Sequence, residues 1–136
     1  MNTDFLDAHD RHWQDAETLF VGKRFANADH LYGLSAECGL KRLMMAFGMK
    51  THSDGTPEDK NDLVHVDKVW VRYESYRSGH SATDYTLPLS NPFGDWDVSQ
   101  RYANQSQFNR ASAASHRRGA DFVRNLIKRA NMEGLL

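Results

Sequence analysis

The sequence predicts an all-α fold, namely an antiparallel up-and-down four-helix bundle with one extra short helix and a long loop between helices 3 and 4. Four segments carry apolar residues at helical spacing, and no two strand-like segments are joined by a hairpin turn signal. The break between the first two segments is as short as the turns that join antiparallel helices. The chain of 136 residues has room for one core, so residues 1–136 are expected to form a single domain.

The first predicted helix runs from about Thr3 to Val21. Asn2 or Thr3 is its predicted N-cap, and Gly22 is predicted to end it. A helix turns by 100° per residue, which places its apolar and histidine residues on one side. These residues are Phe5, His9, His12, Trp13, Ala16, Leu19 and Phe20. That side should face the core.

The second predicted helix, from about Ala26 to Phe47, contains two glycines and a charged pair. Each glycine costs about 1 kcal/mol of helix propensity relative to alanine, so a packing gain must offset it. We expect Gly33 and Gly39 to let neighbouring backbones approach closely, as a central helix crossed by several partners requires. Glu37 and Lys41 stand four residues apart in the favourable order and should pair near the edge of the core.

The third predicted helix runs from near Asp62 to Arg77, and the fourth from about Ser112 to Met132. Between them lies a long loop that contains Pro88 and Pro92. A short helical turn near Val98–Asn104 is expected to close this loop. The loop contains three aromatic residues, Tyr85, Phe93 and Trp96. Their side chains could stack on nucleic-acid bases or cover the end of the bundle.

Cysteine content and hydropathy indicate the compartment. The single cysteine, Cys38, excludes an internal disulfide framework and fits a reducing environment. The N-terminus, MNTDFLDAHD, is acidic and lacks the features of a secretory signal, and no apolar run reaches the roughly 18 residues of a membrane span. A cytoplasmic protein without a membrane partner is expected.

The charge distribution leaves two readings open. The net charge is −1, yet residues 101–136 hold seven Lys/Arg against two Asp/Glu. Arg110, Arg117 and Arg124 recur every seven residues, so they lie on one side of the fourth helix. This side could bind phosphates, or it could complement acidic segments within the monomer or a dimer.

Three stretches in order along the chain carry a family resemblance. Residues 28–43, ADHLYGLSAECGLKRL, resemble the signature helix of the HEPN superfamily (higher eukaryotes and prokaryotes nucleotide-binding). LVHVDKVW at 63–70 is similar to the start of that family's third helix, and Arg101-Tyr102 in QRYANQSQF looks like the Arg-Tyr after its long loop. The resemblance implies a helical bundle that usually forms a homodimer.

The resemblance also implies two alternative functions. Many HEPN proteins are metal-independent endoribonucleases of toxin or defence systems. Their catalytic motif is an arginine followed, after four to six residues, by a histidine, and the motifs of the two protomers meet at the dimer interface. Others are non-catalytic modules that pair with a nucleotidyltransferase or bind nucleotides. Arg110 and His116 match the spacing late in the bundle, as the family has it, and Arg24 and His30 match it earlier. Ala111 departs from the polar residue that usually follows the arginine.

The chemistry of RNA cleavage fits the first pair. Attack by a 2′-hydroxyl needs a base with a pKa near neutrality and a cation for the phosphorane charge, which His116 and Arg110 could supply. Six residues apart on one helix they would be rotated by about 240°, so they converge only if Arg110 precedes the helix or if they act across a dimer. The alternative is a surface arginine and a histidine of the apolar stripe. The expected RNA or nucleotide contacts are Arg101, Tyr102, Arg117 and Arg124.

No cofactor or metal motif is present. His9 and His12 could contribute to a metal site only with a third ligand such as His65 or His116. No HExxH, CxxC or EF-hand pattern supports such a site, so these histidines are expected at the edge of the core.

Overall fold

The computed structural model describes residues 1–79 and 84–136, and it confirms the all-α class. Residues 80–83 of the predicted long loop lie outside the described residues. The α-helices are α1 (Phe5–Val21), α2 (Phe25–Ala46), α3 (Val66–Arg77) and α4 (Arg110–Met132). Three short 3₁₀ segments accompany them, η1 (Lys60–Asp62), η2 (Val98–Tyr102) and η3 (Gln105–Gln107), and η2 is the predicted extra short helix.

Capping side chains account for the helix bounds. Asp4, not Asn2 or Thr3, caps α1, because its carboxylate accepts hydrogen bonds from two backbone N–H groups of the first turn. Asn109 caps α4 in a reciprocal capping box, so this helix begins at Arg110, two residues before the predicted start. In α3 the helix begins only at Val66, since residues 60–62 form η1.

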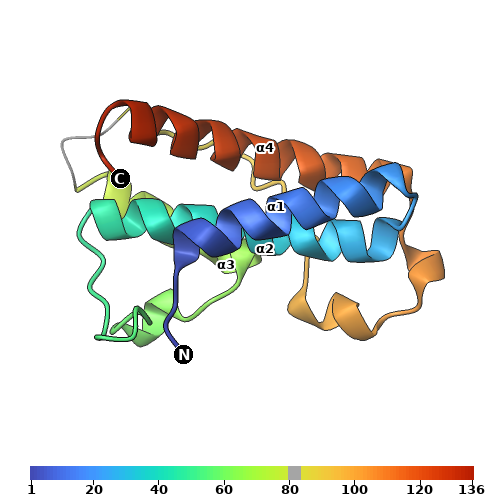
Figure 1. Ribbon diagram of the computed structural model, residues 1–136, viewed down its shortest axis with the longest axis horizontal. Coiled ribbons are helices and arrows are strands. Elements are labelled where there is room, and N and C mark those ends of the chain that lie inside the picture. The colour runs from blue at the N-terminus through green and yellow to red at the C-terminus, as the bar shows by residue number, and fades with distance from the viewer. Residues whose placement is uncertain (80–83) are drawn as a thin grey trace.

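The central helix is α2, which packs against α1, α3, α4 and η2 (Figure 1). A Cβ atom at Gly39 would lie 2.6 Å from Cγ1 of Val123 in α4 and 2.8 Å from Nδ1 of His9 in α1. At Gly33 a Cβ would lie 2.2 Å from the indole of Trp96. The glycines therefore allow the close approach of side chains from α1, α4 and the loop before η2, where the sequence had predicted an approach of neighbouring backbones.

The direction of α3 departs from the predicted up-and-down alternation. His65, just before α3, lies 3.1 Å from the Glu37 carboxylate, whereas Tyr73 further along α3 packs its ring on Phe47 after the end of α2. Helix α3 therefore runs in the same direction as α2 and not against it. The cause is the connection 47–65, which returns along the bundle before α3 begins.

The other two helices have the predicted directions. Helix α1 is antiparallel to α2, since Tyr32 near the start of α2 donates a hydrogen bond to Glu17 near the end of α1. Helix α4 is parallel to α2, as alternation requires, because His116 contacts Asp29 early in both helices (Figure 1). The first residues of α2 and α4 thus lie at the same end of the bundle.

The predicted charged pair lies in the core. Nζ of Lys41 is 3.0 Å from Oε1 of Glu37, and both residues are buried. His65 contacts the second carboxylate oxygen. Among the described helices, none has the length and apolar content needed to cross a bilayer.

Replacement of Gly39 by leucine should destabilise the fold. Despite its better helix propensity, leucine would overpack the contact with Val123 and His9 and lower the free energy of unfolding by about 1–3 kcal/mol in a urea melt. The control is Gly22→Ala, where a Cβ meets only ordinary contacts at 3.4 Å or more and stability should hardly change. Equal stability of wild type and Gly39→Leu would contradict the close approach at α2.

Candidate functional site

His116 is held between two carboxylates from different parts of the chain. Its Nδ1 lies 2.9 Å from Oδ2 of Asp29 in α2, and its Nε2 lies 2.8 Å from Oδ1 of Asp95 in the loop before η2. The ring also stacks on Phe93, with centroids 5.3 Å apart and planes at 15°. His116 and Asp29 are 3 % and 1 % exposed, whereas the Asp95 side chain is 80 % exposed.

The carboxylates determine the charge of this histidine. Burial lowers the pKa of His116, but the hydrogen bonds and charges of Asp29 and Asp95 outweigh it, and the pKa is raised above its ordinary value. Both ring nitrogens then donate. Gln100 donates to the other oxygen of Asp29 at 2.6 Å, which completes the hydrogen bonding of that buried carboxylate.

The histidine faces a polar pocket of about 350 Å³, here named the acidic pocket. Residues of α2, α4, η2, η3 and their flanking loops line it, namely Asp29, Asp95, Asp97, Ser99, Gln100, Ala103, Gln107, Phe108, Ser112 and His116. With three carboxylates and one imidazolium, the lining favours cationic groups and hydrogen-bond donors over phosphate.

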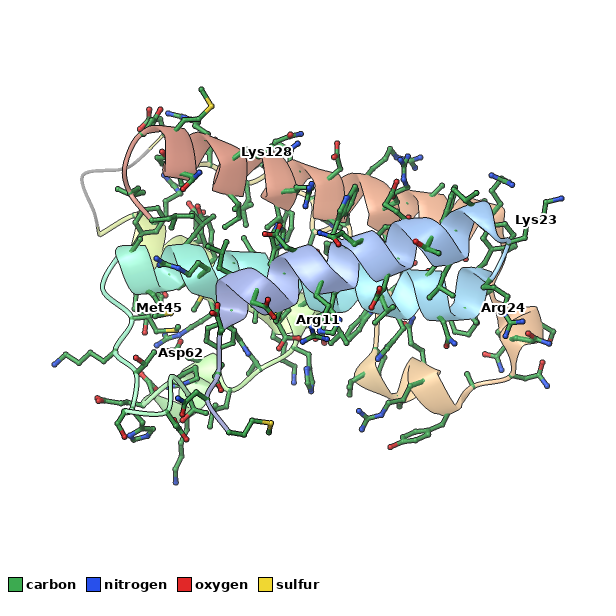
Figure 2. All side chains as sticks on the ribbon, viewed as in Figure 1. Arg11, Lys23, Arg24, Met45, Asp62 and Lys128 are labelled. Carbon is green, nitrogen blue, oxygen red and sulfur yellow. The ribbon has the colours of Figure 1, made fainter. Side chains whose placement is uncertain are left out.

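A second pocket of about 210 Å³, here named the basic pocket, adjoins the first, since Gln100, Ala103 and Phe108 line both. It also contains Lys23, Arg24 and Arg101, together with the first turn of α2 at residues 25–27. That first turn holds no acidic residue and has no side-chain cap, so its backbone N–H groups add positive potential. Lys23 and Arg24 lie at the turn between α1 and α2 (Figure 2).

Lys23 has a strained backbone. Its φ of 60° is in the left-handed region. Among the described residues, Lys23 is the one residue other than glycine with a positive φ. The turn is a Schellman motif, in which N–H of Arg24 donates to the Leu19 carbonyl at 2.8 Å and N–H of Lys23 to that of Phe20 at 3.0 Å. Glycine is the usual residue at this position, so lysine here costs on the order of 1 kcal/mol. Such strain is often retained at functional sites.

The predicted pair Arg110 and His116 has separate partners within one chain. The Arg110 guanidinium lies over the rings of Phe20 and Phe25, at 5.3 and 5.2 Å from their centroids. Both nitrogens of His116 are bonded to carboxylates. Because Arg110 is the first residue of α4 and not a residue before it, the two side chains point in different directions from one helix.

The arginine stripe of α4 packs on α1. Arg117 lies 2.6 Å from Glu17, and Arg124 lies 3.2 Å from Asp10. These ion pairs agree with the reading in which the basic segment complements an acidic one. Arg101 instead lines the basic pocket and lies 4.9 Å from the ring centroid of Tyr102, which is 78 % exposed.

The earlier pair, Arg24 and His30, also has separate surroundings. Arg24 lines the basic pocket, while His30 stacks on Trp96 with ring centroids 5.4 Å apart. Burial, aided by the nearby Arg101, lowers the pKa of His30. Trp96 and Phe93 are buried, so these loop aromatics cover the bundle.

Three of the four histidines considered for a metal site have separate partners, and the fourth, His12, is half-buried. His9 bonds the Ser35 carbonyl, His65 contacts Glu37 and His116 contacts Asp29. Within residues 1–79 and 84–136, no three His, Cys, Asp or Glu side chains are placed to hold a metal ion.

Comparison of the chain with protein-family models, with curated proteins and with solved structures finds no match. The candidate site consists of two adjoining pockets of opposite charge at one end of the helical bundle. Sequence reasoning missed Asp29, Asp95 and Lys23. Asp29 could have been found as a carboxylate seven residues before Ala36, on the small-residue face of the central helix.

The His116 contacts should make stability depend on pH. A histidine whose pKa is raised by folding stabilises the fold fully below its unfolded pKa of about 6.5, and this contribution is lost as pH rises through the folded pKa. Asp29→Asn should lower the pKa of His116 and shrink the stability lost above about pH 6.5. Urea melts across pH and NMR titration of His116 measure both effects.

The matched control for this titration is Asp95→Asn. Its carboxylate is exposed to solvent, so its loss should lower the pKa of His116 less than the loss of Asp29 does. A His116 pKa below that of an ordinary histidine in the wild type would contradict the paired geometry.

Proposed function

We propose that this chain is a HEPN-like module that binds a phosphate-bearing ligand, a nucleotide or RNA, in the basic pocket, without itself supplying catalytic groups. One observation carries the proposal: Lys23, Arg24 and Arg101 line one pocket over the uncapped first turn of α2. Cationic side chains and helix N-terminal N–H groups together are suited to phosphate oxygens. The overall charge of −1 means that any attraction of phosphate is local to such a pocket.

The environment of His116 supports a binding role over a catalytic one. A general base must present an unprotonated nitrogen to the substrate hydroxyl. Both nitrogens of His116 are hydrogen bonded to carboxylates, and three acidic side chains in its pocket disfavour a phosphate there. In this proposal the module acts in the cytoplasm, as a homodimer or with a separate nucleotidyltransferase partner.

Binding of a mixed RNA pool across a salt series tests the proposal. The Arg24→Gln/Arg101→Gln variant should bind RNA more weakly, and the log–log salt slope should flatten by about 1.4 if each arginine contacts one phosphate of a single strand. The matched control, Lys50→Gln/Lys60→Gln, removes two exposed charges on the 47–65 connection and should leave binding unchanged. Lys23→Gly should weaken binding while stabilising the fold by about 1 kcal/mol.

The absence of wild-type RNA or mononucleotide binding at low salt would refute a phosphate-binding function. Equal losses in both double variants would assign the effect to overall charge and not to the basic pocket.

A second candidate is a homodimeric endoribonuclease. The observation that favours it is that His116 lines the acidic pocket directly beside the basic pocket, so RNA held in one could reach the other. In such a dimer Arg110 of one protomer would complete the site at His116 of its partner, after His116 is released from Asp95.

The ribonuclease requires a dimer and a catalytic histidine. Sedimentation should then show a species of twice 15.6 kDa at micromolar protein, and His116→Ala should abolish RNA cleavage while sparing RNA binding. Arg117→Ala, which breaks an ion pair with α1, is the control and should retain cleavage. A monomer, or cleavage that survives His116→Ala, would exclude this candidate.

A further inference from the structure

We propose that an unpaired base of single-stranded nucleic acid stacks on Tyr102, beside the basic pocket. The proposal rests on the phosphate-binding function of that pocket and adds the class of nucleic acid that it takes. Its central feature is an aromatic ring that the fold leaves in water, next to an arginine of the pocket.

Tyr102 is far more exposed than the aromatic residues that cover the bundle. It is 78 % exposed, whereas Tyr85, Phe93 and Trp96 are each 2 % exposed or less. It is the last residue of η2, and Figure 1 shows the segment with η2, in orange, projecting from the bundle. The core therefore does not need this ring, and its surface is free to meet a ligand.

Arg101 covers one face of the tyrosine ring. The guanidinium carbon lies 4.9 Å from the ring centroid, within the range of a cation–π interaction. Because the ring of Tyr102 remains largely exposed, its opposite face is open to solvent. Every nucleic-acid base has a π-face, so a base of any identity can stack on such an open aromatic face.

The same arginine connects the ring to the basic pocket. Arg101 and Ala103 line this pocket, so Tyr102 lies between two of its lining residues in the chain. Arg117 is neutralised by Glu17, whereas Arg101 has no acidic partner among the described residues. A phosphate held at Arg101 therefore has a free cation beside it, and a base of the same strand is brought to the open face of the tyrosine.

An open aromatic face selects single strands over duplexes. In a duplex each base is paired and stacked on its neighbours, so no base face is available to the tyrosine. Three cationic side chains from two segments, Lys23, Arg24 and Arg101, suit consecutive phosphates of a strand better than one phosphate. If phosphates alone were bound, the duplex, with its denser charge, would bind at least as tightly as the single strand.

The test compares one RNA of about 12 nucleotides as a single strand and annealed to its complement, by fluorescence polarisation at one salt concentration. The single strand should bind at least about 10-fold more tightly than the duplex. Tyr102→Ala should weaken single-strand binding about 10-fold, while Tyr102→Phe, which keeps the ring, should bind like the wild type. The log–log salt slope should be the same for Tyr102→Ala and wild type, because no phosphate contact is lost.

The matched control is Phe122→Ala. Phe122 lies on α4, is 38 % exposed and does not line the basic pocket, so its loss should leave binding unchanged. A 2-aminopurine base in the strand, whose fluorescence falls on stacking, should be quenched by the wild type and by Tyr102→Phe but not by Tyr102→Ala. Urea melts should show that all three variants are as stable as the wild type, since the replaced rings are exposed.

Equal affinity of the wild type for single strand and duplex, or undiminished single-strand binding by Tyr102→Ala, would overturn the stacking site and leave the phosphate-binding function intact. Binding of a mononucleotide but of neither form of the RNA would overturn the single-strand inference alone. If RNA and mononucleotide both fail to bind at low salt, the phosphate-binding function fails and this inference fails with it.

Discussion

The close approach of three neighbours to α2 is the constraint on which the rest of the structure depends. Gly33 and Gly39 leave room for Trp96 on one side and for Val123 and His9 on another. Because neighbours cover α2 on several sides, polar residues of this helix are buried along with apolar ones. Asp29, Glu37 and Lys41 are among them, and each needs a partner.

Those partners come from other elements and so define how the elements fit together. Asp29 is matched by His116 of α4 and by Gln100 of η2, and the Glu37 carboxylate is shared by Lys41 and by His65 at the start of α3. A buried charge that lost its partner would be strongly destabilising, so a shifted packing of α3 or α4 is disfavoured. Structural pairing and the candidate site are therefore built from the same residues.

The placement of the two pockets follows from helix direction. Because α2 and α4 run the same way, their first turns lie at one end of the bundle, where the segment with η2 and η3 packs against α2 (Figure 1). Gln100, Ala103 and Phe108 of this segment separate an acidic pocket around His116 from a basic pocket around Arg24. The phosphate-binding function proposed for the basic pocket would place the ligand beside an acidic pocket that favours hydrogen-bond donors.

The sequence by itself determined the helices and the thin face of α2, because apolar periodicity, caps and glycines act within a few residues of one another. The seven-residue spacing of Arg110, Arg117 and Arg124 likewise indicated that these arginines lie on the same side of one helix. Only the tertiary structure decided what that side meets, and two of these arginines pair with Glu17 and Asp10 of α1. It also decided the direction of α3 and the pairing of Asp29 with His116, which are 87 residues apart. Such contacts depend on the path of long connections, for which local sequence carries no periodic signal.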